Sequence, residues 1–251
     1  MSENTRRRGG TAALLLGFAV LYFIIALMAI HAVGTDAGLY YDEQMKAGVL
    51  PRAGISDGDL KTLDGCLADY LRGDEAALTP GDPFNEREMT HMKDCFDLFD
   101  LLRKARSRLI PWAILLILGG AWLLQDRKRA RLCAWLSPLI LILPLGAFAI
   151  YAVADFDRAF TLFHRILFRN DLWLLDPRTD LLIRICPEAM FMHMGVRILI
   201  YSLIGILAVS AAATALSFLW PKRKEDNSWN NRDMRGGSGQ KQISFGKTGM
   251  R

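Results

Sequence analysis

TAALLLGFAVLYFIIALMAIHAV, residues 11–33, contains no lysine, arginine, aspartate or glutamate. A hydrocarbon core of about 30 Å is crossed by roughly 20 helical residues, so this run is long enough to span a bilayer. Three further apolar runs follow it, at residues 109–124, 132–154 and 196–220. The sequence therefore predicts an all-α membrane protein with four transmembrane helices.

The first apolar run follows three arginines, Arg6, Arg7 and Arg8, which is also how a secretory signal peptide begins. The run is longer than the roughly 7–15 residues of a signal peptide's apolar region, and no small-x-small cleavage site follows it. We therefore interpret it as a retained membrane anchor.

The composition agrees with a membrane protein. Of 251 residues, 52% are hydrophobic and 23% are charged, and the mean hydropathy is +0.18. These values argue against an ordinary soluble domain, a disordered chain and a main role in binding nucleic acid, despite the net charge of +5. Four cysteines are too few for a disulfide scaffold, and none of them lies in a CxxC pair, so the sequence does not support a zinc knuckle either.

The distribution of charge predicts the orientation. With the N-terminus inside, the cytoplasmic segments carry 15 basic and 5 acidic side chains, and the rest of the chain carries 16 basic and 21 acidic. This is the positive-inside pattern, although Arg103, Lys104, Arg106 and Arg108 crowd the outer end of the second span. The predicted cytoplasmic segments are the basic N-terminus at residues 1–10, a loop at residues 125–131 and a disordered tail at residues 221–251. The predicted extracellular segments are residues 34–108 and 155–195, which form a small, mainly helical cap.

The first extracellular segment has two helix-start patterns. Ser56 with Asp59 resembles a capping box before leucines at helical spacing, and Gly73 can end that helix. Asn85 with Glu88 predicts a second helix, running to about Arg106. His91 and Cys95 share a face of this helix, with Asp94 to one side.

The second extracellular segment is aromatic. Phe156, Phe160, Phe163 and Leu167 form a stripe at helical spacing, and Asp157, His164 and Phe168 lie on the adjoining face. Each ring taken singly fits a hydrophobic core or an interfacial belt. As a group, these rings predict an apolar pocket at the level of the lipid headgroups.

All four histidines fall on the outer side in this topology. His31 and His193 lie at helix ends and fit structural roles, whereas His91 and His164 lie among acids and aromatic rings. A neutral imidazole is suited to proton transfer near pH 7, and Asp94 or Asp157 could orient one by accepting its other N–H. A metal site that adds Glu88 or Asp94 has weak ligand spacing and no HExxH motif, and no GxSxG motif indicates a serine nucleophile.

Two blocks carry a family resemblance. Residues 84–94, FNEREMTHMKD, resemble an "RE..HM.DV" element of the four-span lipoprotein intramolecular transacylases. Residues 163–177, FHRILFRNDLWLLDP, resemble the second hallmark of that family, which continues through residues 180–183, DLLI, and residues 187–191, PEAMF. Cys95 departs from the family, which usually has valine there, and we expect this change to affect packing rather than chemistry.

The resemblance implies an acyltransferase whose partner is a diacylglyceryl-modified bacterial lipoprotein. The sn-2 acyl chain moves to the α-amine of the lipoprotein's N-terminal cysteine, giving a lyso-form lipoprotein at the cell membrane. The two essential histidines of the family correspond to His91 and His164. The resemblance implies a reaction without a cofactor. It also implies that membrane lipids are partners of the protein and that nucleic acid is not.

The remaining candidate residues would support this chemistry. An aromatic wall of Phe160, Phe163, Phe168, Trp173 and Phe191 would exclude water, which competes with the amine. Arg87, Arg165 or Arg169 would steady an oxyanion, or else contact headgroups or pair with Asp171, Asp176 and Asp180. Glu188 belongs to the second resembling block.

Two alternatives stay open at this point. A metal-dependent membrane lipid hydrolase would use water as the acceptor and would lose activity with a chelator. A non-enzymatic membrane scaffold would tolerate alanine at His91 and His164.

Overall fold

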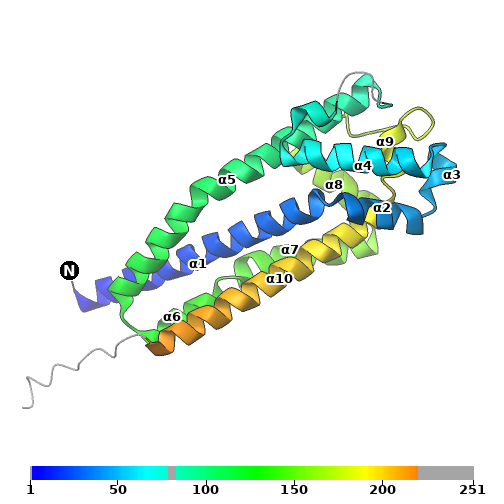
Figure 1. The fold of residues 1–251 in the computed structure, drawn as a ribbon. Coiled ribbons are helices and arrows are strands. Elements are labelled where there is room, and N and C mark those ends of the chain that lie inside the picture. Colours follow the sequence, from blue (N-terminus) through cyan, green and yellow to red (C-terminus); the bar gives the residue numbers. More distant parts are fainter. Residues whose placement is uncertain (1, 79–82, 220–251) are drawn as a thin grey trace, which may run out of the picture. The chain divides into compact units, whose positions relative to one another are not determined.

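The computed structural model describes residues 2–78 and 83–219, so the predicted tail at residues 221–251 lies outside the described residues. Within the described residues, four helical stretches are long and apolar enough to cross a membrane. They are α1 (Glu3–Gly34), α5 (Glu86–Leu124), α6 (Arg127–Leu136) with α7 (Leu139–Ala154), and α10 (Glu188–Leu219). The expected all-α class with four apolar helices is confirmed (Figure 1).

Shorter helices form the cap at one end of the long ones (Figure 1). They are α2 (Ala37–Lys46), α3 (Val49–Ala53), α4 (Asp57–Arg72), the 3-10 turn η1 (Glu75–Ala77), α8 (Phe156–Leu167) and α9 (Leu181–Ile185). Ser56 caps α4 by accepting a hydrogen bond from the Asp59 N–H, and Gly73 ends the helix with a φ of 122°. The sequence pattern predicted both ends of α4.

The long helices extend past the apolar runs. α1 begins at Glu3 rather than near Thr11, and α10 begins at Glu188 rather than near residue 196. The predicted end near Arg106 was wrong, because α5 continues through Pro111 to Leu124. An apolar run marks the part of a helix that fits the hydrocarbon, whereas charged turns can continue the same helix outside it. Pro111 removes only one backbone hydrogen-bond donor from the helix.

The third run is two helices rather than one. The segment expected as a loop at residues 125–131 already contains the start of α6, and the chain breaks at Ser137 and Pro138 before α7. The Ser137 hydroxyl donates to the Cys133 carbonyl at 2.6 Å, and the Pro138 carbonyl accepts from the Leu141 and Ile142 N–H groups at 3.0 and 2.9 Å. A proline with a preceding serine therefore ends one helix and starts the next.

α1 contacts each of the other spanning stretches. It approaches α5 closely because Gly10 and Gly120 face each other: a Cβ atom on Gly10 would lie 2.7 Å from the Leu124 nitrogen, and one on Gly120 would lie 2.9 Å from the Leu14 nitrogen. Small residues allow such close backbone approach in membrane bundles. The Tyr22 hydroxyl donates to the Ala134 carbonyl and lies 2.8 Å from the Ser210 hydroxyl, which joins α1, α6 and α10.

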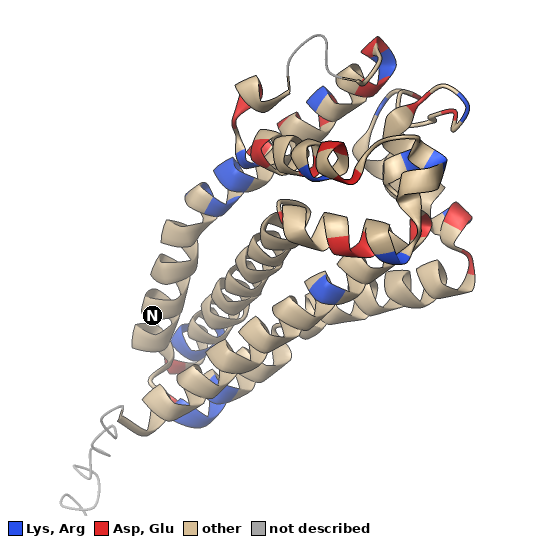
Figure 2. Cartoon of the chain, turned by 45° about the vertical axis from the view of Figure 1, so that its right-hand side comes forward, with Lys and Arg blue, Asp and Glu red and all other residues tan. Residues whose placement is uncertain are grey.

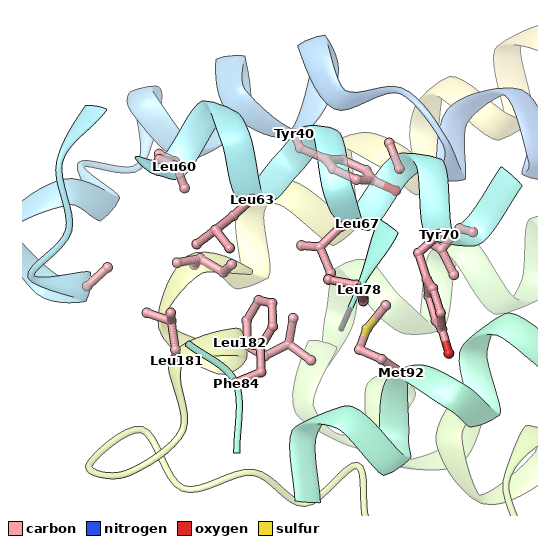
Figure 3. Close-up of a cluster of buried hydrophobic side chains, with 14 of the residues drawn as sticks. Tyr40, Leu60, Leu63, Leu67, Tyr70, Leu78, Phe84, Met92, Leu181 and Leu182 are labelled. Atoms are coloured by element: carbon pink, nitrogen blue, oxygen red, sulfur yellow. The ribbon is translucent and has the colours of Figure 1, made fainter. Parts of the chain in front are cut away.

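The cap has its own hydrophobic core, distinct from the one between the spanning helices. In the cap, leucines of α4 pack against Phe84, Met92 and the residues of α9 (Figure 3). Charged residues lie mainly toward the two ends of the long helices, and few are found along the middle of the bundle (Figure 2). The cap is therefore a folded layer that holds the start of α5 and the whole of α8 beside the bundle.

Candidate active site

The first turn of α5 is fixed by a reciprocal capping box. Asn85 Oδ1 accepts from the Arg87 and Glu88 N–H groups at 2.9 and 3.1 Å, and Glu88 Oε2 accepts from the Asn85 N–H at 2.8 Å. The other oxygen of Glu88 accepts from the Leu182 N–H at 2.5 Å, and the side chain is only 1% exposed. Glu88 therefore ties the start of α5 to the start of α9, one turn before His91.

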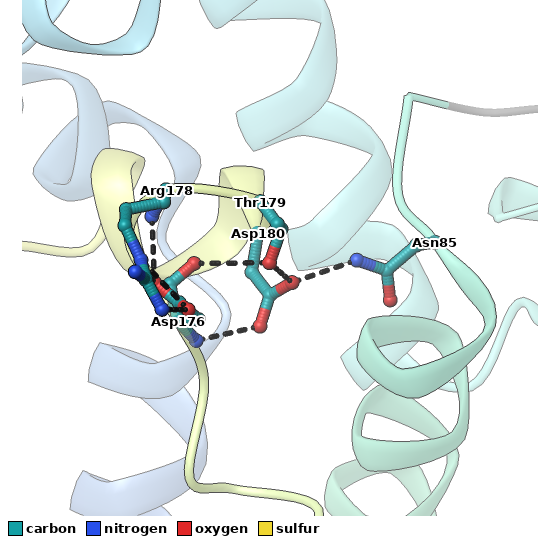
Figure 4. Close-up of polar contacts among 5 residues, drawn as sticks. All are labelled: Asn85, Asp176, Arg178, Thr179 and Asp180. Carbon is teal, nitrogen blue, oxygen red and sulfur yellow. Dashed lines mark hydrogen bonds and ion pairs between the residues drawn. The ribbon is translucent and has the colours of Figure 1, made fainter.

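Asp180 holds the loop before α9. Its oxygens accept from the Asp176 N–H at 2.7 Å, the Thr179 hydroxyl at 2.8 Å and the Asn85 amide at 2.8 Å (Figure 4). Burial alone would raise the pKa of Asp180, but these hydrogen bonds outweigh it and lower the pKa. Asp180 is thus a buried structural carboxylate that joins this loop to α5.

α8 presents His164 with one nitrogen already occupied. Asp155 caps the helix by accepting from the Arg158 N–H at 3.1 Å, and His164 Nδ1 donates to the Phe160 carbonyl at 2.8 Å. A carbonyl oxygen can only accept a hydrogen bond, so Nδ1 carries the hydrogen and Nε2 carries the lone pair of the neutral ring. Burial lowers the pKa of His164, and the bond to Phe160 partly offsets this effect.

Aromatic rings surround His164. Their centroids lie 3.9 Å from the imidazole centroid for Phe160, 4.9 Å for Trp173, 5.3 Å for Phe163 and 5.6 Å for Phe168. The Trp173 indole N–H donates to the Asn170 carbonyl at 2.9 Å. Phe191 of α10 completes the wall at 5.7 Å from Phe160. All five aromatic residues expected around the pocket therefore lie in one cluster with this histidine.

His91 lies beside this cluster. Its ring centroid is 6.1 Å from that of His164 and 5.2 Å from that of Phe168. Burial, and then the neighbouring His164, lower the pKa of His91 to about 4. Its Nδ1 atom is buried and has no hydrogen-bond partner among the described residues. Both imidazoles are therefore neutral at pH 7 and next to each other.

Cys95 contacts His91 directly. Its sulfur lies 3.7 Å from His91 Nε2, and burial, followed by the nearby Asp94, raises the pKa of the thiol to about 12. The thiol is thus protonated and touches the imidazole. The sequence led us to expect that this cysteine affects packing only. In the structure, its thiol also makes a hydrogen-bonding contact with the imidazole.

The expected pairing of a carboxylate with an imidazole differs from the structure. Asp94 Oδ2 accepts from the Asn170 amide at 2.9 Å, whereas the partner of His164 is a backbone carbonyl and Asp157 is exposed. The side chain of a helical residue folds back over the preceding turn, which brings His164 Nδ1 to the carbonyl four residues earlier. Asn170, which the sequence reasoning did not single out, links Asp94 to Trp173.

The remaining candidates lie around the rim. Arg87 donates to the Asp171 backbone carbonyl at 2.5 Å, so it holds the loop rather than pairing with a carboxylate. Asp176 forms its ion pair with Arg178, whereas the sequence analysis considered only Arg87, Arg165 and Arg169 as partners. Three candidates, Arg169, Asp171 and Glu188, are exposed. Within residues 2–78 and 83–219, no group of three or more His, Cys, Asp or Glu side chains is placed to hold a metal ion.

Comparisons with known proteins bear on this site. The family model described as lipoprotein intramolecular transacylase Lit matches residues 14–191. A solved structure of the membrane integral lipoprotein intramolecular transacylase Lit from Bacillus cereus is 24% identical, with a TM-score of 0.65 over 86% of this chain and 97% of that one. A histidine-to-arginine variant of the same Bacillus cereus protein is 23% identical, with a TM-score of 0.62 over 92% of this chain and 96% of that one. Comparison with curated protein sequences finds no match.

Proposed function

Because this chain belongs to the lipoprotein intramolecular transacylase family, an acyltransferase family of the membrane, we propose that it converts a diacylglyceryl lipoprotein to its lyso form. In the proposed reaction, the α-amine of the lipoprotein's N-terminal cysteine attacks the carbonyl carbon of the sn-2 ester. A nitrogen–carbon bond forms and the bond from that carbon to the glyceryl oxygen breaks. The products are an amide and a free hydroxyl on the same molecule, so the reaction needs no external acceptor.

His164 is the general base in this proposal. An α-amine has a pKa of about 8, so a base close to neutrality suffices to take its proton after attack. The Nδ1–H bond to the Phe160 carbonyl leaves the lone pair on Nε2, which supports this nitrogen as the acceptor. The same bond favours the imidazolium that forms, because its donor becomes more positive.

His91 is the donor to the departing oxygen. Its low pKa keeps the ring neutral, so it gives a hydrogen bond to the glyceryl oxygen as the carbon–oxygen bond breaks. That oxygen takes the proton from His91, and the proton held on His164 then restores His91. The observation that carries the proposal is the 6.1 Å separation of the two ring centroids inside one aromatic cluster.

In this proposal, the aromatic wall orients the bound lipid and excludes water. The reacting amine and ester lie in one molecule, but the cyclic transition state has about eight atoms and little tendency to close by itself. Rigid rings around His164 restrict the conformations that the bound lipid can adopt. They also keep out water, which would turn transfer into hydrolysis.

The test is mass spectrometry of a reporter lipoprotein's N-terminus from cells with and without the protein. We expect an N-acyl, S-monoacylglyceryl terminus only when the protein is present, and its loss with His91→Ala or His164→Ala. His193→Ala is the matched control, because His193 lies on α10 and contacts Glu43 of α2. An unchanged N-terminus in cells with the folded wild-type protein contradicts the proposal.

Two further outcomes identify the alternatives. A product that has lost the sn-2 chain without gaining an N-acyl group indicates a hydrolase, and loss of that activity with a chelator indicates a metal-dependent one. Full activity of both alanine variants, with surface changes in the cap abolishing function, indicates a scaffold.

We also propose that both termini are cytoplasmic and that the cap faces outward. The three arginines in the first turns of α1 and the basic start of α6, which contains Arg127, Lys128 and Arg129, support this orientation. Both lie at the end of the bundle away from the cap (Figure 2). An impermeant thiol reagent on intact cells should label a cysteine placed at Lys61 of the cap and leave one placed at Arg8 unlabelled.

A further inference from the structure

α8 has three faces with different surroundings. Phe160 and His164 face the aromatic cluster, and Asp157, Arg158 and Arg165 are exposed on a second face. Three large apolar residues on the third face are also exposed, by 42% for Leu162, 45% for Phe163 and 71% for Ile166. Among the residues that the structure describes, these three side chains are left largely uncovered.

The apolar face of α8 continues the lipid-facing surface of α7. α7 is part of a membrane-spanning stretch, and near its end Ile150 and Val153 are 74% and 75% exposed. α8 starts two residues after α7 ends, and the two helices contact each other. Exposed apolar side chains are therefore present both near the end of a stretch long enough to cross a bilayer and, after the charged residues Asp155, Asp157 and Arg158, on the helix that carries His164.

The charges on α8 fit a position at the membrane boundary. Arg158 pairs with Asp155 at 3.1 Å, and Arg165 lies exposed on the same side of the helix, next to the apolar face. Helices that lie along a bilayer surface have this arrangement: an apolar face in the acyl region and arginines beside it at the headgroups. Arginine stems also reach from the apolar zone to the headgroups.

We propose that α8 is an interfacial helix whose Leu162, Phe163 and Ile166 face is immersed in the acyl chains of the leaflet on the cap side. The partner of this face is the lipid bilayer itself. Phe163 belongs to both environments, since its ring is half-exposed and also lies 5.3 Å from the His164 ring. The helix thus places His164 at the depth where lipid ester groups lie.

This arrangement has a consequence that rests on the proposed function. An ester of a membrane-anchored substrate would reach His164 by moving sideways in the leaflet, past Phe163, without leaving the membrane. Burial of the α8 face in lipid would therefore be a condition for catalysis as well as for attachment.

The immersion of α8 is tested by site-directed spin labelling of the full chain in phosphatidylglycerol–phosphatidylcholine vesicles. Nitroxides are attached at Leu162→Cys and Ile166→Cys, with Arg165→Cys as the matched control one residue away and the unsubstituted protein as background for native thiols. We expect the ratio of oxygen to nickel-chelate accessibility to be severalfold higher at positions 162 and 166 than at position 165.

Two results overturn the proposal. Equal nickel-chelate accessibility at positions 165 and 166 would place the face in water. Shielding of position 166 from both reagents, with an immobilised spectrum in vesicles, would instead show that a protein, such as a second copy of this chain, covers it. Neither result depends on enzymatic activity.

The catalytic consequence is tested separately. Ile166→Lys is expected to lower the transfer rate severalfold in vesicles, whereas Thr161→Lys, which adds the same side chain away from the apolar face, is expected to keep most of the rate. A full rate for Ile166→Lys overturns this consequence. A wild-type protein without any transfer would refute the proposed function, while the accessibility result would stand.

Discussion

At the scale of single residues, the site is defined by what each imidazole nitrogen touches. His164 Nδ1 is held by a carbonyl of its own helix, His91 Nε2 by a thiol, and His91 Nδ1 by nothing in the described residues. One nitrogen of the His91 ring therefore contacts the Cys95 thiol, and the other has no hydrogen-bond partner among the described residues. In the proposed reaction, a group that reaches this nitrogen would not have to displace a hydrogen bond within the protein.

The pH dependence of the rate should reflect the substrate amine rather than the histidines. Burial lowers both imidazole pKa values, so both rings are mainly neutral above pH 6.5, whereas the amine loses its reactive form below about pH 8. We expect the rate to fall about tenfold per pH unit between pH 7.5 and 6.5. Initial rates with a purified lipoprotein measure this, and a rate that stays flat over that interval would contradict it.

Asp64 in the cap core should make stability depend on pH. Burial raises its pKa to about 7, and the 2.9 Å bond from the Gln44 amide offsets this only in part. A raised carboxyl pKa means that the folded state binds the proton more tightly. The contribution of Asp64 to the free energy of unfolding is therefore largest below the unfolded pKa of about 4 and is lost as the pH rises through about 7.

Replacing this carboxyl tests the argument. Asp64 Oδ2 and Gln44 Oε1 are both buried without partners, and an amide at position 64 can donate where the carboxylate cannot. We expect Asp64→Asn to raise stability at pH 8 by on the order of 2 kcal/mol and to change it little at pH 4. Thermal unfolding in detergent measures this, with the exposed Asp42→Asn as control. A gain that is the same at both pH values would show that titration is not the cause.

At the scale of elements, the start of α5 depends on one carboxylate that caps two helices. Glu88→Ala would leave the buried Leu182 N–H and the part-buried Asn85 N–H without their acceptor, and a hydrogen bond to a charged group is worth about 1.5–3 kcal/mol. We expect a loss of about 3 kcal/mol or more in thermal unfolding, together with loss of activity because His91 lies one turn away. Glu86→Ala, which removes an exposed glutamate from the same turn, should cost far less. Equal losses would show that the effect is helix-dipole charge rather than capping.

The sequence predicted some element boundaries and missed others for physical reasons. The capping patterns at Ser56 and Asn85 are local, since the cap and the N–H groups it satisfies lie within three residues, and both helix starts were correct. The change from charged to apolar residues near Arg106 reflects the surroundings of a helix rather than its end, so α5 was cut too short. The break at Pro138 is caused by two residues within an apolar run. Mean hydropathy does not detect it, because the run stays apolar on both sides of the break.

The candidate site was predictable to a different degree. Histidines and aromatic rings in two separate segments indicated which residues meet, and the structure brings them together. Their hydrogen-bond partners could not be read from residue types, because a backbone carbonyl at Phe160 carries no signal in the sequence. Asn170 and Cys95 matter through contacts that only the three-dimensional arrangement provides.

At the scale of the whole bundle, the contact between α1 and α5 sets the frame on which the cap stands. Gly120→Ala would place a Cβ atom 2.9 Å from the Leu14 backbone nitrogen, so the two helices must separate. We expect a loss of about 1–3 kcal/mol, as for other overpacked interiors. Gly119→Ala is a close control, because nothing lies within 4 Å of its Cβ position. Thermal unfolding of the two variants in one detergent compares them, and equal effects would rule out close approach as the reason for the glycine.

The unbroken course of α5 has a mechanical consequence. Its 39 residues form one helix of about 58 Å, with His91 near the cap and Leu124 at the end away from the cap. A thinner or thicker bilayer tilts a long rod to match its hydrophobic length. Such a tilt would move His91 relative to His164, because His164 lies on a different helix, α8. We therefore expect the distance between the two imidazoles to depend on the thickness of the surrounding bilayer.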